Sequence, residues 1–141
     1  PLGKIGGLIC YEGVFPVASL RLVEQGASLL VNPTNDTWYG ATSGPWQHLE
    51  FYRMRALETG RPILRVANSG ISGWFDPLGR AYDLTALNEE SATIVNVNRA
   101  VVDTPYVRLG GAPSWFILAV APFLLIFARL RRRDPEATDK P

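Results

Sequence analysis

Short apolar runs alternate along the chain with longer stretches in which apolar residues recur every three to four positions. The first three apolar runs are short and contain or adjoin glycine, proline or asparagine, which is typical of buried strands. They are Ile5–Cys10, Ala27–Val31 and Ile63–Ala67. Between them, helical spacing predicts helices over Phe15–Glu24 and Pro45–Thr59.

After the third run the pattern changes to short segments separated by turn residues. Strands are predicted over Ile71–Phe75 and Ser91–Val97, with a turn at Asp76–Gly79. The order is therefore strand, helix, strand, helix, strand, followed by strands that suit antiparallel pairing. This order predicts an α/β domain with a mixed sheet over residues 1–108.

The most apolar part of the chain comes near its end. Residues Ala112–Ala128 are apolar apart from Pro113 and Ser114, and a group of arginines follows at once. The run is close to the lower limit of roughly 17 residues for a membrane span. We expect one transmembrane helix over residues 112–130 and a basic, polar tail over residues 131–141. The alternative is a buried C-terminal core helix.

The arginines after this run also predict an orientation. They are Arg129, Arg131, Arg132 and Arg133. Arginines next to a span are retained on the cytoplasmic side of a membrane. If the helix spans, the tail is therefore cytoplasmic and the α/β domain lies on the opposite face.

Composition narrows the possible classes of protein. Hydrophobic residues make up 47% of the 141 residues and charged residues 19%, so the chain can form a packed core. A net charge of +1 argues against a general nucleic-acid binder. The chain begins with Pro1 rather than methionine, and a strand follows within a few residues. We therefore expect it to be part of a longer protein.

Cys10 is the only cysteine, which excludes an intrachain disulfide and a cysteine-based zinc site. It is predicted to end a strand directly before a helix. Backbone N–H groups at a helix start favour the thiolate form of a cysteine and can stabilise an oxyanion. Glu12 is close enough in sequence to contact the same site. Cys10 is thus a candidate nucleophile, with a buried structural cysteine as the alternative.

Other polar residues have simpler explanations. His48, the only histidine, could pair with Cys10, but packing within its own helix is the favoured interpretation. Asn35 and Asp36 are predicted to form a turn at a strand end. A solvated ion-pair network is the ordinary explanation for the charges at Arg53, Arg55, Glu58, Arg61 and Arg65.

Several sequence strings, taken in order, resemble the nitrilase (carbon–nitrogen hydrolase) superfamily. The nucleophile segment of that superfamily resembles Ile9-Cys10-Tyr11-Glu12. The later strings continue this match in order and cover nearly the whole chain. They are Asn32–Gly40, Gly44–Leu49, Arg53–Glu58, Gly60–Pro62, Asn68–Ser72 and Thr104–Tyr106. Among them, Trp38-Tyr39-Gly40, Gly44–His48 and Thr104–Tyr106 are similar to the apolipoprotein N-acyltransferase family of this superfamily.

The resemblance implies a Glu-Lys-Cys triad on an αββα sandwich, of which this chain would form the C-terminal part. Only the cysteine maps onto the chain, as Cys10; the glutamate and the lysine lie upstream in the family. The backbone N–H of Tyr11 would serve as oxyanion donor, and Glu12 would orient the site. Trp38 and Tyr39 would line the path of the acyl chain, although core packing explains them equally well.

The implied chemistry is acyl transfer through a thioester on Cys10, without a metal or cofactor. The acyl donor would be a phospholipid and the acceptor a diacylglyceryl lipoprotein, at the bacterial inner membrane with the catalytic domain in the periplasm. Two other interpretations stay open. They are a nitrilase-type amidase that hydrolyses a small amide, and a non-catalytic interaction module tethered to a membrane.

Overall fold

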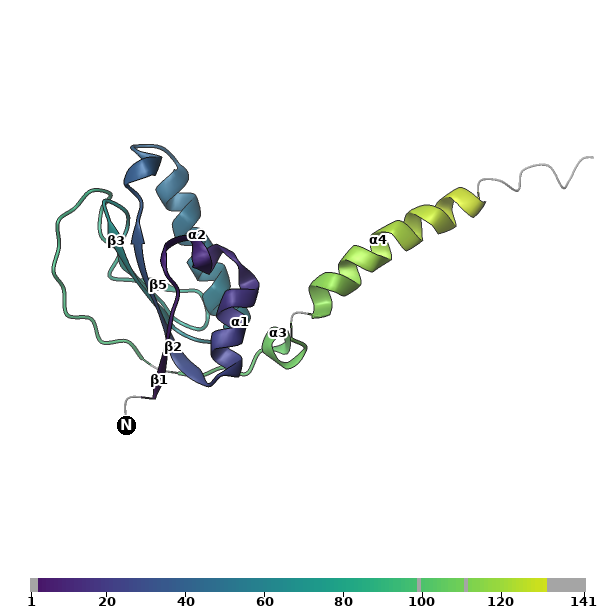
Figure 1. Cartoon of the computed structure of the whole chain (residues 1–141), viewed down its shortest axis with the longest axis horizontal. Coiled ribbons are helices and arrows are strands. Elements are labelled where there is room, and N and C mark those ends of the chain that lie inside the picture. The colour runs from purple at the N-terminus through teal and green to yellow at the C-terminus, as the bar shows by residue number, and fades with distance from the viewer. Residues whose placement is uncertain (1–2, 99, 111, 132–141) are drawn as a thin grey trace, which may run out of the picture. The chain divides into compact units, whose positions relative to one another are not determined.

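The computed structural model describes residues 3–98, 100–110 and 112–131. The chain divides into two units, one over residues 1–110 and the other over residues 111–141 (Figure 1). The first unit contains the sheet, the helices that cover it and Cys10. The second contains a single long helix.

The sheet has five strands in the order β1-β2-β3-β4-β5. Strands β1, β2 and β3 are parallel, whereas β4 and β5 continue the sheet in antiparallel pairing. The mixed α/β sheet predicted from the sequence is therefore confirmed. The strands span Lys4–Gly7 (β1), Ala27–Asn35 (β2), Ile63–Asn68 (β3), Gly73–Phe75 (β4) and Ala81–Tyr82 (β5).

Two helices cover one face of this sheet, α1 (Pro16–Glu24) and α2 (Gly44–Thr59) (Figure 1). Each has a proline in its first turn, where the missing N–H costs no helical hydrogen bond. Helix α2 ends at Gly60, whose φ of 60° lies in the left-handed region that glycine adopts without strain. The shorter helices are η1 (Cys10–Val14), η2 (Thr37–Tyr39) and α3 (Pro105–Arg108).

The core lies between the helices and this face of the sheet. Leu30 and Ile63 are fully buried on neighbouring strands, and Leu49 and Ala56 meet them from α2. On the opposite face of the sheet, Val66 is 55% exposed. Within the described residues the architecture is thus one helical layer on one sheet, which is half of the predicted αββα sandwich.

Two strand boundaries differ from the prediction. β1 ends at Gly7, so Cys10 is not a strand residue but the first residue of the 3-10 helix η1. β2 continues to Asn35, because β3 pairs with it in parallel up to Asn35 and Asn68. The predicted turn at Asn35–Asp36 is therefore wrong for Asn35, which belongs to a strand.

The predicted strand Ser91–Val97 is absent from the described part of the chain. Ile94 in this segment is fully exposed, and no described strand forms a ladder with it. A β-strand needs a neighbour for its backbone hydrogen bonds, so alternation of residues alone does not form one. The short strand β5 was not predicted, and it pairs with β4 across the turn that follows Phe75.

The second unit contains α4 (Ala112–Arg131), which includes the helix predicted over residues 112–130. No helix in the described ranges is both long enough and apolar enough to cross a membrane. The transmembrane character predicted for residues 112–130 is therefore not confirmed. Most of the predicted tail, from Arg132 to Pro141, lies outside the described residues.

Candidate active site

Cys10 occupies a strained backbone conformation at the start of η1. Its φ of 50° lies in the left-handed region, which costs a residue with a Cβ roughly 1–2 kcal/mol. Such residues persist where surrounding contacts hold them, and they concentrate at functional sites. The feature supports the interpretation of Cys10 as more than a packing cysteine.

The side chain of Cys10 is partly exposed and borders an open depression of about 340 Å³. Trp38 lines the same depression and is 71% exposed. It also lines an adjoining depression of about 380 Å³ with Tyr11 and Tyr39. The structure therefore brings together four of the residues singled out from the sequence, with aromatic rings beside the thiol.

Glu12, the fifth of those residues, contacts the backbone of the turn. Its carboxylate oxygen Oε2 accepts a hydrogen bond from the Ile9 N–H at 2.7 Å. The Ile9 carbonyl in turn accepts from the Glu12 N–H at 3.1 Å. These reciprocal bonds cap the start of η1 and close the chain around Cys10.

Two buried side chains hold the carbonyl oxygen of Cys10. The Tyr52 hydroxyl donates to it at 2.5 Å, and the Asn32 side-chain amide donates to it at 3.1 Å. The same amide donates to the carbonyl of Leu8 at 2.5 Å. Both partners of Asn32 are carbonyl oxygens that can only accept, which fixes the orientation of its amide group.

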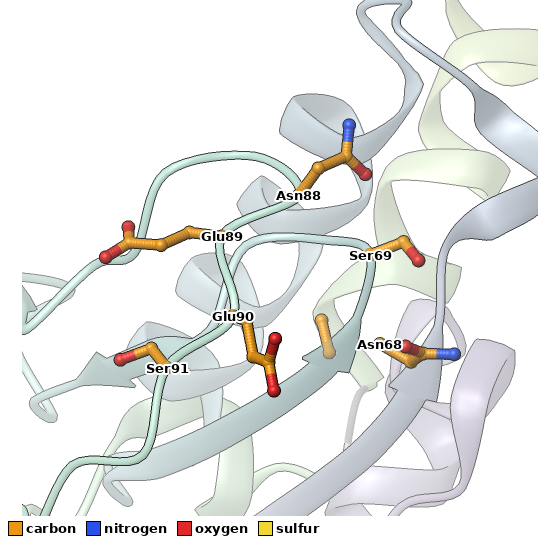
Figure 2. Close-up of a pocket in the computed structure, with 7 residues that line it drawn as sticks. Asn68, Ser69, Asn88, Glu89, Glu90 and Ser91 are labelled. Carbon is orange, nitrogen blue, oxygen red and sulfur yellow. The ribbon is translucent and has the colours of Figure 1, made fainter.

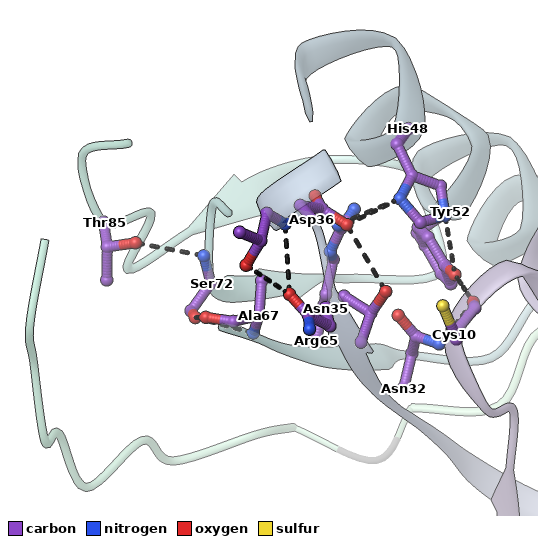
Figure 3. Close-up of polar contacts among 12 residues, drawn as sticks. Cys10, Asn32, Asn35, Asp36, His48, Tyr52, Arg65, Ala67, Ser72 and Thr85 are labelled. Carbon is purple, nitrogen blue, oxygen red and sulfur yellow. Dashed lines mark hydrogen bonds and ion pairs between the residues drawn. The ribbon is translucent and has the colours of Figure 1, made fainter. Parts of the chain in front are cut away.

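A charged network lies behind Tyr52 (Figure 3). The Asp36 carboxylate accepts from His48 Nδ1 at 2.9 Å and from Arg65 Nη2. His48 Nε2 lies 3.3 Å from the Tyr52 hydroxyl, and the Arg65 guanidinium lies over the Tyr52 ring. All four side chains are buried. A chain of contacts thus leads from Asp36 through His48 and Tyr52 to the backbone of Cys10.

The electrostatics follow from this burial. Burial alone would raise the pKa of Asp36, but the His48 hydrogen bond and the Arg65 charge outweigh it, so the pKa lies below its ordinary value. Burial raises the pKa of Tyr52 well above its ordinary value. Tyr52 is therefore a protonated hydrogen-bond donor throughout the physiological range.

Sequence reasoning missed most of this network. Asp36 was expected to form a turn and Arg65 to join a solvated ion-pair network, yet both side chains are fully buried. Arg55 is also buried, and its Nη1 donates to the Val14 carbonyl at 3.2 Å. His48 was expected to pack within its own helix, but it is buried and pairs with Asp36 outside that helix. An arginine inside an apolar strand was the available signal for a buried partner.

A polar depression of about 440 Å³ lies near this site (Figure 2). Its lining residues contact those of the Cys10 depression, because Asn68 pairs with Asn35 and the hydroxyls of Thr37 and Ser69 lie 3.2 Å apart. Across residues 3–98, 100–110 and 112–131, no group of three or more His, Cys, Asp or Glu side chains is placed to bind a metal ion.

A mixed sheet with a cysteine at the turn after its first strand suits one class of hydrolase, and a comparison with family profiles identifies the same class. The profile of the carbon-nitrogen hydrolase family matches residues 1–107. The chain belongs to this family.

Curated relatives narrow the comparison further. An apolipoprotein N-acyltransferase of Bradyrhizobium diazoefficiens is 40% identical over 91% of this chain and 24% of its own length. Another of Rickettsia bellii is 51% identical over 61% of this chain and 17% of its own length. The chain thus spans about a quarter of the length of the curated relatives that it matches over most of its residues.

Solved structures show the same fold. A carbon-nitrogen hydrolase from Helicobacter pylori G27 superposes with a TM-score of 0.53 at 20% identity, over 62% of this chain and 38% of that one. The NitFhit protein of C. elegans gives a TM-score of 0.51 at 27% identity, over 62% of this chain and 23% of that one. The nitrilase-type fold is therefore shown for the first unit.

Proposed function

We propose that this chain is the nucleophile-bearing part of an apolipoprotein N-acyltransferase. The observation that carries the proposal is the turn at Cys10, where a strained cysteine opens onto a depression beside exposed aromatic rings. Tyr11 lies in the first turn of η1, where backbone N–H groups have no partner within the helix. An unpaired N–H one residue after the nucleophile is suited to bind an oxyanion.

The proposed reaction has two halves. The Cys10 thiolate attacks the ester carbonyl of a phospholipid, the sulfur–carbon bond forms, and the ester C–O bond breaks. The lysophospholipid leaves with the proton that the thiol gave up. The α-amine of a diacylglyceryl lipoprotein then attacks the thioester, the nitrogen–carbon bond forms, and the C–S bond breaks. One amine proton returns to the Cys10 sulfur.

The proposed roles of the neighbouring residues follow their positions. The backbone N–H of Tyr11 binds the oxyanion, and Glu12 keeps the turn closed so that this N–H and the sulfur face the same side. Trp38 and Tyr39 line the path of the acyl chain beside Cys10. The general base and a lysine are supplied by residues that precede this chain in the longer protein.

The domain layout is proposed on the same basis. Residues 1–108 form the C-terminal part of the catalytic domain, residues 112–130 attach it to the bacterial inner membrane, and residues 131–141 lie in the cytoplasm. The catalytic domain is placed in the periplasm. The arginines that follow the apolar segment support this orientation.

The decisive experiment uses the full-length protein with a radiolabelled phospholipid and a diacylglyceryl lipopeptide. Cys10→Ala should abolish both the trapped thioester and the N-acylated product. Cys10→Ser should be nearly as damaging, because a serine hydroxyl is far less acidic than a thiol and is a much weaker nucleophile in the same site. Normal turnover by the alanine variant would refute the assignment, and hydrolysis of a small amide without acyl transfer would favour an amidase.

A further inference from the structure

The peptide bond between Cys10 and Tyr11 carries the C=O of Cys10 and the N–H of Tyr11, which point in opposite directions. In a trans peptide the C=O and the N–H point to opposite sides of one rigid plane. The C=O of Cys10 points inward to Tyr52 and Asn32, so the N–H of Tyr11 points away from them. Whatever holds the carbonyl therefore also sets the direction of the N–H.

We infer that Tyr52 and Asn32 are positioning residues for acyl transfer, which together hold the Cys10–Tyr11 peptide so that its N–H faces the developing oxyanion. The inference rests on the proposed function. It adds two residues that do not touch the substrate and act through the backbone. Their hydrogen bonds also offset the unfavourable φ of Cys10, which has no other side-chain support at its carbonyl among the described residues.

The packing around Tyr52 shows that its hydroxyl is held rather than loosely placed. Its ring is fully buried and lies under the Arg65 guanidinium, with 4.9 Å from Cζ to the ring centroid. A Cβ added at Gly13 would overlap the Tyr52 ring, so glycine in η1 permits the close approach. The ring can deliver its hydroxyl to Cys10 only because η1 has no side chain at this position.

The Tyr52 hydroxyl has two possible acceptors, and its shorter contact is to the Cys10 oxygen. The Asp36 carboxylate only accepts, so His48 Nδ1 must carry the hydrogen of their 2.9 Å bond. The Tyr52 hydroxyl lies 2.5 Å from the Cys10 oxygen and 3.3 Å from His48 Nε2. Its single hydrogen is therefore directed to Cys10, and the imidazole fills the space behind the hydroxyl.

The test compares two reactions of Cys10 in the full-length protein. Acylation by phospholipid passes through an oxyanion, whereas alkylation of the thiol by iodoacetamide does not. Tyr52→Phe removes only the hydroxyl and should lower kcat for acylation about tenfold or more. The KM for phospholipid and the rate of alkylation should change less than about twofold, because the sulfur and the lipid path are retained.

A matched control and a second variant complete the design. Tyr82→Phe removes the hydroxyl of another tyrosine, which donates to Asp76 far along the chain, and should leave both reactions unchanged. Asn32→Asp replaces the second donor by an acceptor and should repeat the selective loss of acylation. If acylation by Tyr52→Phe equals that of the unmodified protein, the positioning role is wrong.

Other outcomes separate this inference from the proposed function. Equal loss of acylation and alkylation with a lowered melting temperature would mean that Tyr52 is only structural, which also overturns the inference. Retained activity in Cys10→Ala would refute the proposed function itself. Inactive Cys10→Ala together with fully active Tyr52→Phe and Asn32→Asp would leave the acyltransferase standing and refute the positioning role alone.

Discussion

Replacing Asp36 by asparagine tests whether the buried charges behind the nucleophile turn act as a unit. The change keeps the shape of the side chain and removes its charge. Asp36 and Arg65 are both 0% exposed, so the variant leaves the Arg65 guanidinium buried without its counter-ion. Removing one partner of a buried ion pair typically costs about 3–5 kcal/mol, and we expect a loss of that size.

The chain offers a matched control for the same chemical change. Asp103 pairs with Arg108 through side chains that are 63% and 67% exposed. Asp103→Asn should therefore cost less than about 1 kcal/mol. Hydrogen exchange in the full-length protein, followed in peptides from β2, β3 and α2, measures the local free energy of opening for both variants.

The result that would refute this account is a cost for Asp36→Asn no larger than for Asp103→Asn. The pH dependence gives an independent check. The pKa of Asp36 is lowered in the folded state, so its contribution is present above the unfolded value of 3.8 and is lost as the pH falls through the lower folded value. Unmodified protein should lose protection in that acid window, and Asp36→Asn should not show this loss.

Three further predictions concern other parts of the chain. Burial raises the pKa of Glu58, and the charge of Arg55 offsets this rise only in part. The stability of the unmodified protein relative to Glu58→Gln should therefore fall as the pH rises above 4.5. Urea unfolding of both proteins, followed by hydrogen exchange across this range of pH, can measure the difference. The isolated chain should transfer no measurable acyl group from phospholipid to lipopeptide, because the proposed base and lysine precede it; robust turnover would contradict the mapping. A fluorescent protein that matures only in the cytoplasm should glow when fused after Arg133, and a phosphatase active only outside should be silent there; the reverse pattern would place the catalytic domain in the cytoplasm.

The sequence predicted the elements that depend on local pattern. Both main helices were predicted to within one residue, because proline and glycine mark their ends. The three parallel strands were found because each is a short buried run. Their ends were less accurate, since β2 is lengthened by a partner that begins almost thirty residues later, at Ile63. The predicted strand Ser91–Val97 failed for the same reason, as pairing cannot be read from one strand alone.

The candidate site divides in a similar way. Cys10 and its aromatic neighbours were found from short strings, and the structure places them around connected depressions. Asp36 was expected to form a turn, and Arg65 was expected in a solvated network because charged residues are exposed unless they are paired. Arg65 lies on the β3 face that meets the helices, between Ile63 and Ala67. The alternation of residues within β3 could have indicated that Arg65 is buried, but not which residue would neutralise its charge.

The backbone conformation of Cys10 therefore depends on residues far from its own sequence string. Local residues bring Cys10 to a strand-to-helix junction, where Glu12 caps the turn. The donors that hold the Cys10 carbonyl lie 22 and 42 residues away, at Asn32 and Tyr52. Both side chains are buried, so we expect their substitution to change the acylation rate through the backbone of Cys10 rather than through contact with a lipid. A loss of acylation with alkylation of the thiol retained is the signature that distinguishes this proposed positioning role from a structural one.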